Sequence, residues 1–195
     1  MKRVSSNSDE LLQVFLRQRS ESSFRKLYRC HTPALFAMAM RLCGTTTSAE
    51  ELTQDTWCRA VERIKRFERK SRFRTWLVGI LINCYRESVR DAVRMPQASE
   101  SELAHLSVAA ITPLRKPDDQ QADVLDVERA LSALPPGYKE VVLLHDLGGY
   151  THREIAAMLD ISDGTSKSQL KRGRERLRTF LVNRSADSAG TRGLS

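Results

Sequence analysis

Apolar residues recur at the spacing of an α-helix through most of this chain, and this periodicity is the strongest constraint on its fold. Residues three and four positions apart lie on one face of a helix. One such stripe comprises Ala49, Leu52, Thr53, Thr56, Trp57, Ala60, Val61 and Ile64. No stretch shows the apolar–polar alternation that is typical of a β-strand. The sequence therefore predicts an all-α fold.

A segment with a different composition separates two blocks of helical periodicity. Met95-Pro96 should end the preceding helix, because proline lacks an N–H donor and restricts the residue before it. Residues 97–126 contain two basic and six acidic residues. We therefore predict two small helical domains joined by a flexible linker. Their predicted bounds are 8–95 for the first domain, 96–123 for the linker, 124–184 for the second domain and 185–195 for a frayed tail.

Several local signals predict where helices begin and end. Pro33 should break or kink the helix in which it lies, and Gly44 is a plausible helix end. The segments Ser48–Glu51 and Thr151–Glu154 both have the pattern of a capping box, in which a hydroxyl and a glutamate satisfy backbone N–H groups at a helix start. Each segment predicts the beginning of a helix.

The second block contains the pattern of a helix-turn-helix. A short helix after Thr151 is followed by the tight turn Asp160-Ile161-Ser162 and then by a longer basic helix. On the longer helix, the side chains opposite Leu170 can reach base edges in the major groove of duplex DNA. They are Lys167, Ser168, Lys171 and Arg172. Three further arginines are placed for phosphates, which position a protein without specifying sequence: Arg174, Arg176 and Arg178.

Positive charge is concentrated in both blocks. The whole chain carries a formal net charge of +8; residues 63–94 contain ten basic and three acidic residues, and residues 161–184 seven and two. In the first block, aromatic residues interleave with the basic ones, which suits single-stranded nucleic acid. They are Phe67, Phe73, Trp76 and Tyr85. Phe73 and Trp76 are, by themselves, more typical of a core, and the Asn83 amide among apolar neighbours needs a hydrogen-bond partner.

Other classes of protein are disfavoured. No apolar run approaches the length of about 20 residues that crosses a membrane, and no apolar segment follows the amino terminus as in an exported protein. The four cysteines are widely spaced, and Cys30, His31 and Cys43 lack a fourth zinc ligand at a suitable spacing. No P-loop or catalytic triad is present. We therefore expect a cytoplasmic protein that is not an enzyme and has no metal, cofactor or small-molecule substrate.

Together these motifs resemble the bacterial sigma factors. The segment AEELTQDTW at residues 49–57, followed by Phe67, SRFRTWL at residues 71–77, Ile80 and Asn83, is similar to region two of that family. The segments from Leu134 to Val142 and from Tyr150 to Leu177 are similar to region four. With only these two regions and a short linker, the chain resembles the extracytoplasmic-function (group IV) sigma factors.

The resemblance implies a function and partners. Such a protein directs the core RNA polymerase to promoters, promotes DNA melting and leaves catalysis to the core. The implied partners are the clamp helices of the largest polymerase subunit, the beta flap, promoter DNA and an anti-sigma factor, which could hold the chain at the inner membrane.

The resemblance also assigns residues. Core binding is implied for Glu51, Gln54 and Asp55. Contact with the minus-ten element is implied for Phe67, Arg72, Arg74, Ile80 and Asn83. Reading of the minus-thirty-five duplex is implied for Lys167, Ser168, Lys171, Arg172 and Arg174.

This sequence departs from the family pattern at several positions. Arg69 stands where relatives often have glycine, so the loop after Phe67 is expected to differ in shape. Ser166 replaces an apolar residue on the inward face of the basic helix, and we expect its hydroxyl to bond to a carbonyl one turn earlier. Gln169 and Lys171 also differ from common choices, which leaves the promoter sequence open.

Two other functions remain as alternatives. A conventional helix-turn-helix regulator would bind a palindrome as a dimer, with the first block serving dimerisation or sensing. A recombinase or nuclease would need clustered carboxylates that hold a metal. The group Glu50, Glu51 and Asp55 could supply some of them, but no second acidic cluster accompanies it.

Overall fold

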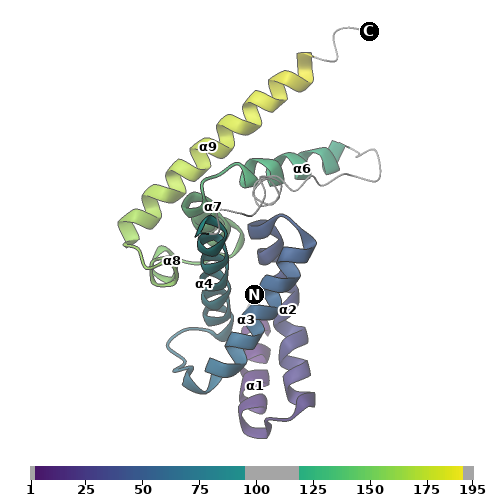
Figure 1. Cartoon of the computed structure of the whole chain (residues 1–195), viewed down its shortest axis with the longest axis vertical. Coiled ribbons are helices and arrows are strands. Elements are labelled where there is room, and N and C mark those ends of the chain that lie inside the picture. Colours follow the sequence, from purple (N-terminus) through teal and green to yellow (C-terminus); the bar gives the residue numbers. More distant parts are fainter. Residues whose placement is uncertain (1–2, 95–118, 191–195) are drawn as a thin grey trace. The chain divides into compact units, whose positions relative to one another are not determined.

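A computed structural model describes residues 3–94 and 119–190 of the chain (Figure 1). Every regular element within these two ranges is helical, which confirms the predicted all-α class. The chain divides into two compact units, with the boundary at Pro96. Most of the predicted linker, residues 96–118, lies outside the described residues, as do residues 191–195 of the predicted tail.

The first unit is a bundle of helices (Figure 1). Helix α2 packs against both α1 and α3, and α4 packs mainly against α3. A short 3-10 turn, η1, follows α3 directly, and a loop connects it to α4. The bounds are α1 Arg3–Gln18, α2 Glu21–Cys43, α3 Thr46–Arg63, η1 Ile64–Arg66 and α4 Phe73–Arg94.

The predicted apolar stripe of α3 forms part of the core. Its members are buried, except Val61, which is exposed. Trp57 lies at the junction of α2 and α3, where its ring contacts the rings of Phe24 and Tyr28 and its indole N–H donates to Thr32 Oγ1. An indole that both packs and finds a hydrogen-bond acceptor can be buried without leaving a donor unsatisfied.

Helix α3 begins earlier than the sequence predicted. Gly44 ends α2 in a left-handed conformation, with φ of 81°, as expected. Thr45 follows with an extended backbone, and its Oγ1 accepts from the backbone N–H of Ser48. The prediction of a capping box at Ser48–Glu51 is therefore wrong, because Thr45 caps the helix three residues upstream.

Pro33 does not break its helix. Helix α2 runs continuously from Glu21 to Cys43, with Pro33 on its exposed side. A proline inside a helix costs about 3 kcal/mol, but Leu27, His31 and Leu35 are all buried on the opposite side. We attribute the continuity of α2 to this packing on both sides of the proline.

Helix α1 was not predicted as a separate element, and it begins at Arg3 rather than at the predicted boundary of residue 8. Its side chains Leu12 and Phe15 are buried, and Phe15 contacts Phe24 of α2. A second link joins the two helices, because the buried Ser8 hydroxyl lies 2.9 Å from Nε2 of His31.

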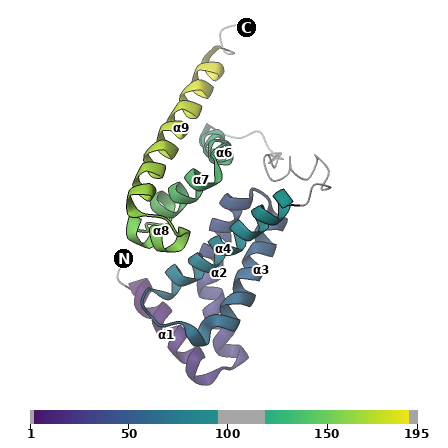
Figure 2. The same ribbon diagram turned by 60° about the vertical axis from the view of Figure 1, so that its left-hand side comes forward.

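Between residues 119 and 190, the second unit contains the helices α6, α7, α8 and α9, which are labelled in Figure 2, and a π-helical turn, η2. The long helix α9 packs against α6, α7 and α8. Helix α6 begins five residues before the predicted start at residue 124, and α9 extends six residues past the boundary predicted at Arg184. The bounds are α6 Asp119–Ser132, α7 Pro136–Val142, η2 Leu143–Leu147, α8 His152–Leu159 and α9 Asp163–Gly190.

The core of the second unit is built where α7 and η2 meet α8 and α9. The buried residues of α7 and η2 include Val141, Val142, Leu143 and Leu144. Ile155 and Leu159 of α8 and Leu170 of α9 are also buried. The π-helical turn directs the two polar residues His145 and Asp146 away from the buried Leu143 and Leu144. These two polar residues take part in the site described below.

Candidate nucleic-acid interface

Helices α8 and α9 form the predicted helix-turn-helix. Thr151 and Glu154 make a complete capping box at the start of α8, which confirms that prediction. Asp160 ends α8 in a left-handed conformation, with φ of 53°. Ser162 then caps α9, because its Oγ accepts from the Thr165 N–H at 3.0 Å. These caps satisfy backbone groups at the end of α8 and at the start of α9, on either side of a three-residue turn. They therefore fix the start of α9 beside α8.

The residues predicted to read duplex DNA lie on the exposed surface of α9. Lys167, Ser168, Lys171 and Arg172 are all exposed, whereas Leu170 and Ser166 are buried. Arg172 also lines a surface groove with Leu134 and Tyr138. The N-terminal half of α9 therefore presents cations and a hydroxyl to solvent, which is the composition that major-groove and phosphate contacts require.

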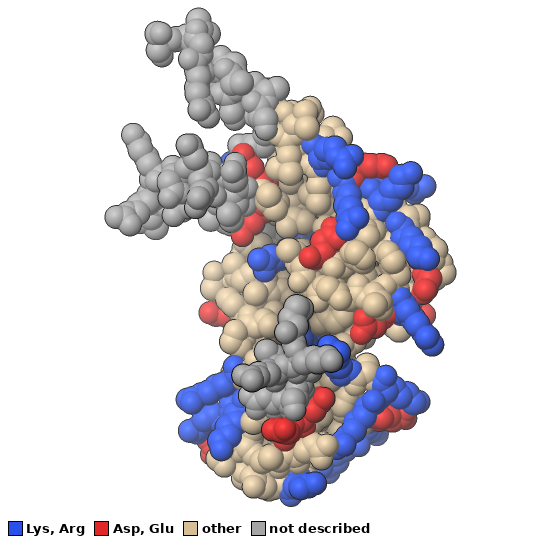
Figure 3. Space-filling view, turned by 180° about the vertical axis from the view of Figure 1, so that it is seen from behind, with Lys and Arg blue, Asp and Glu red and all other residues tan. Residues whose placement is uncertain are grey.

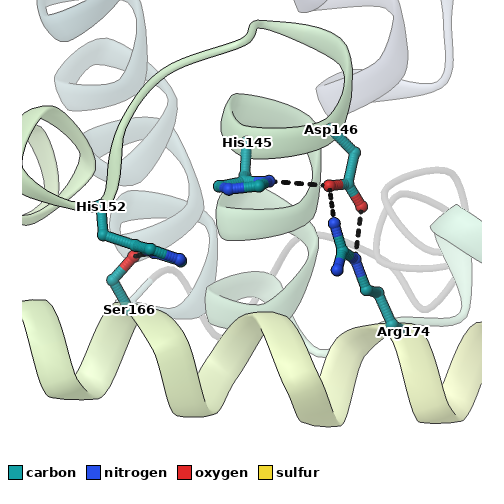
Figure 4. Close-up of polar contacts among 5 residues, drawn as sticks. All are labelled: His145, Asp146, His152, Ser166 and Arg174. Carbon is teal, nitrogen blue, oxygen red and sulfur yellow. Dashed lines mark hydrogen bonds and ion pairs between the residues drawn. The ribbon is translucent and has the colours of Figure 1, made fainter.

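Arg174 has an internal partner that the sequence did not indicate (Figure 4). Its Nε donates to Asp146 Oδ2 at 3.0 Å, and its Nη2 donates to Oδ1 at 2.5 Å. The same Oδ1 lies 2.8 Å from Nδ1 of His145. The hydrogen bond from Arg174 lowers the pKa of the Asp146 carboxyl, and the same bond raises the pKa of Arg174. Arg174 was predicted to contact phosphate, but in this structure its guanidinium is hydrogen-bonded to Asp146.

Ser166 and His152 link the two helices of the motif (Figure 4). The Ser166 hydroxyl lies 2.9 Å from Nδ1 of His152, so the prediction that it bonds to a carbonyl one turn earlier is wrong. His152 is half-buried, and its ring stacks on His145 with centroids 4.8 Å apart. Burial lowers the pKa of His152, with smaller contributions in the same direction from His145 and Lys167.

A second basic surface lies on the first unit. The loop between η1 and α4, together with its flanks, carries seven exposed cations. Figure 3 shows Lys and Arg side chains on the surface of both units. Arg69 lies in this loop with φ of 56°, a left-handed conformation that is unfavourable for a residue with a Cβ. The seven are Arg63, Lys65, Arg66, Arg69, Lys70, Arg72 and Arg74.

The aromatic residues of this region pack mainly on one another. Phe73 and Tyr85 are buried, and Phe67 and Trp76 are half-buried. The Phe67 ring contacts Trp76 at a centroid distance of 5.1 Å and Phe73 at 5.7 Å. Phe73 and Tyr85 thus serve the core, which leaves the accessible parts of Phe67 and Trp76 as the aromatic surface beside the basic loop.

The remaining residues predicted for the minus-ten element differ in exposure. Arg72, Arg74 and Asn83 are exposed, so the Asn83 amide meets solvent rather than an apolar interior. Ile80 is buried, with 6% of its surface exposed. Asn83, Arg72 and Arg74 are therefore available to a ligand directly, whereas Ile80 lies within the core of the bundle.

A polar face on α3 carries the residues implied in core binding. Glu51, Gln54 and Asp55 are all exposed, while Leu52 and Thr53 between them are buried. The helical period thus places the three side chains on the solvent side of α3, where a partner protein could reach them.

Within residues 3–94 and 119–190, no group of three His, Cys, Asp or Glu side chains is arranged to hold a metal ion. Across the same ranges, no helix combines the length and apolar character needed to span a membrane. None of the four cysteines, all of which lie in residues 3–94, forms a disulfide: Cys30 and Cys58 are exposed, Cys43 is half-buried and Cys84 is buried.

The fold and surfaces define a class of two-unit helical proteins that carry a helix-turn-helix. Comparison with family models narrows this class to one protein family. Residues 27–95 match the model for Sigma-70 region 2, and residues 125–177 match the model for Sigma-70, region 4. Both regions occur in the order that the motifs predicted.

Curated proteins with similar sequences carry related names. The chain is 30% identical over 170 residues to the RNA polymerase sigma factor CarQ of Myxococcus xanthus, covering 85% of this chain and 92% of CarQ. It is 30% identical over 158 residues to the ECF RNA polymerase sigma factor EcfG of Rhodopseudomonas palustris, covering 81% and 84%. It is also 30% identical over 174 residues to the ECF sigma factor SigE of Mycolicibacterium smegmatis, of which it spans 66%.

Solved structures of sigma factors resemble this chain as well. The sigma factor RpoE of Bartonella quintana, in complex with the anti-sigma factor NepR, superposes with a TM-score of 0.67 at 31% identity, covering 81% of this chain and 96% of RpoE. CnrH, in complex with the cytosolic domain of CnrY, shares the fold, with a TM-score of 0.62 at 24% identity and coverage of 90% and 98%. The chain belongs to the sigma-70 family, in its extracytoplasmic-function group.

Proposed function

We propose that this protein is a dissociable promoter-specificity subunit of bacterial RNA polymerase. The observation that carries the proposal is the presence of regions 2 and 4 in order, each on its own helical unit and each with an exposed basic surface. The family consists of transcription initiation factors, so the chemistry of RNA synthesis belongs to the core enzyme.

The duplex-reading surface is the N-terminal half of α9. Lys167, Ser168, Lys171 and Arg172 read or contact the minus-thirty-five element, supported by their exposure on a capped helix of a helix-turn-helix. Arg174 belonged to the same sequence prediction, but its pairing with Asp146 gives it a different role, argued in the next subsection.

The single-strand surface is the loop before α4 with the start of that helix. Arg72 and Arg74 neutralise the backbone of the melted non-template strand, and Phe67 and Asn83 contact an exposed base of the minus-ten element. The exposure of these cations and of the Asn83 amide beside a half-buried Phe67 supports this proposal. Ile80 is a core residue, and its role in this proposal is to set the shape of the surface that carries Phe67 and Asn83.

Partner proteins complete the proposal. Glu51, Gln54 and Asp55 on the exposed face of α3 bind the clamp helices of the largest polymerase subunit, and the second unit binds the beta flap. The structure of RpoE with NepR supports an anti-sigma partner for this chain as well. The protein then acts in the cytoplasm, where an anti-sigma factor could hold it at the inner membrane.

The test is transcription with purified components. Core polymerase is incubated with the full chain and a genomic fragment library, and the transcripts are sequenced to locate start sites. Transcripts that share upstream elements and require this chain as the single added factor would support the proposal. Activation only alongside another sigma factor, or a dimer footprint on a palindrome without core polymerase, would refute it and favour a conventional regulator.

A further inference from the structure

Two of the three arginines predicted to contact phosphate from α9 have partners within the second unit. Asp146 binds Arg174 through both carboxylate oxygens. The guanidinium carbon of Arg176 lies 5.4 Å from the centroid of the Tyr138 ring, a cation–π contact. Arg178 remains exposed. The cations of α9 are therefore not equivalent, although the sequence presents them as one series.

The position of Arg174 makes its pairing consequential. Lys167, Lys171, Arg174 and Arg178 follow one another at intervals of four, three and four residues, which aligns them along one stripe of the helix. Asp146 reaches this stripe from the π-helical turn and places a carboxylate in the middle of a row of cations. Its negative charge neutralises the third member of the row.

Stability alone is a weak explanation for this ion pair. The side chains of Arg174 and Asp146 are 52% and 30% exposed. Pairs in contact with solvent contribute about 0–1 kcal/mol, because water and salt screen their attraction. The larger effect of Asp146 is on the charge that α9 presents to a polyanion.

We propose that Asp146 is a specificity-determining residue that neutralises Arg174 and thereby limits sequence-independent attraction of α9 to DNA. This inference rests on the proposed duplex-reading role of α9. Phosphate contacts strengthen binding to every sequence equally, whereas base contacts discriminate. Withholding one phosphate-directed arginine lowers non-specific binding and leaves base reading by Lys167, Ser168, Lys171 and Arg172 in place.

The salt dependence of DNA binding tests this directly. Each phosphate neutralised by a protein cation contributes about −0.9 to the slope of log Kobs against log salt concentration. The full chain is titrated against a mixed-sequence DNA duplex by fluorescence anisotropy at several salt concentrations. Asp146→Asn should make the slope more negative by about 0.9, and the double variant Asp146→Asn/Arg174→Ala should return it to the wild-type value.

Single substitutions of the cations provide a second, independent comparison. Arg174→Ala should leave the slope unchanged, since its charge is already neutralised. The comparison cation is Lys167 rather than Lys171, because Lys171 Nζ lies 4.0 Å from Glu175 Oε1. Lys167→Ala should make the slope less negative by about 0.9. The charge-matched control is Asp126→Asn, which removes a carboxylate paired with Arg129 in α6 and should not alter the slope. Far-UV circular dichroism establishes that each variant is folded. If Asp146→Asn does not fold, the comparison of Arg174→Ala with the wild-type chain still tests the inference.

Three results would overturn the inference. They are an unchanged slope in Asp146→Asn, an equal shift in Asp126→Asn, or a less negative slope in Arg174→Ala. The proposed function fails separately, if the wild-type chain gives no promoter-dependent transcription with core polymerase. A wild-type chain that supports transcription while Asp146→Asn keeps the wild-type slope would refute the inference alone.

Discussion

Gly173 on α9 lies directly against Val142 on α7: a methyl group at Gly173 would meet Val142 Cγ2 at 2.7 Å and the Cβ of Tyr138 at 3.5 Å. Gly173 is buried in the middle of a long helix, where glycine is unfavourable by about 1 kcal/mol relative to alanine. The absence of a side chain is therefore a packing requirement, and it brings α9 close to α7.

We predict that Gly173→Ala lowers the free energy of unfolding of the second unit by about 1–3 kcal/mol, because the added methyl group overpacks this contact. Gly164→Ala is the matched control on the same helix, since its Cβ would meet only Ser162 Oγ, at 3.7 Å. Hydrogen–deuterium exchange of α7 and α9 amides measures the effect. Faster exchange in Gly164→Ala, or unchanged exchange in Gly173→Ala, would contradict the prediction.

The first unit should lose stability in mild acid because of His31. Its imidazole is buried between the Ser8 hydroxyl and the Phe73 ring. Burial and the nearby Arg74 lower its pKa, against a smaller opposing effect of Asp9. The folded state thus favours neutral His31, so this contribution is complete above the unfolded pKa of about 6.5 and decreases as pH falls below it.

Tryptophan fluorescence can follow this loss, since both tryptophans, Trp57 and Trp76, lie in the first unit. Urea unfolding of the wild-type chain should show a midpoint that falls between pH 7.5 and 5.5. In His31→Gln, the midpoint should be lower at pH 7.5 and change less with pH. A pH dependence that is as steep in His31→Gln as in the wild type would assign the effect to another group.

Arg69 provides a prediction about the basic loop. Its φ of 56° costs roughly 1 kcal/mol for a residue with a Cβ and almost nothing for glycine. Arg69→Gly should therefore raise the free energy of unfolding of the first unit by up to about 1 kcal/mol, measured by tryptophan fluorescence. Arg66→Gly removes an equal charge from η1, where φ is not positive, and should lower it. If both variants changed the free energy of unfolding in the same direction, the backbone conformation of Arg69 would be excluded as the cause.

The two basic surfaces should separate in function. Arg172→Ala should weaken binding of holoenzyme to upstream duplex by about 5–150-fold, on the scale of 1–3 kcal/mol for a specific contact. Asn83→Ala should retain this binding and reduce promoter opening, measured by permanganate reactivity of unpaired thymines. Arg25→Ala, an exposed arginine paired with Glu21 on α2, is the control for loss of charge. Equal loss of duplex binding in Arg172→Ala and Asn83→Ala would refute the division.

Most of the local structure could be predicted because its signals lie within one helix. The capping box at Thr151–Glu154, the end of α2 at Gly44 and the core side of α3 each depend on residues within a few positions of one another. Where two capping signals lay close together, the predicted start of the helix was wrong. Thr45 and Ser48 can both cap α3, and the upstream residue does so.

Contacts between distant residues could not be predicted in this way. Ser166 and His152 are 14 positions apart, Asp146 and Arg174 are 28 apart, and Ser8 and His31 are 23 apart. The adjacent pair His145-Asp146 at the end of a helix was visible in the sequence, but nothing local indicated that α9 would pass within hydrogen-bond distance. Likewise, only the packing of α1 on α2 shows that Ser8 belongs to the core.

The sequence by itself determined the helical class, the helix-turn-helix, the exposed cations of α9 and the family, since each depends on periodicity, capping and motif order along the chain. The tertiary structure decided which of those cations remain available. A charged side chain of α9 meets solvent or a partner according to which helix packs beside it, and that depends on the fold of the whole unit. Asp146 neutralises Arg174, and Tyr138 holds Arg176, because α7 and η2 lie against α9.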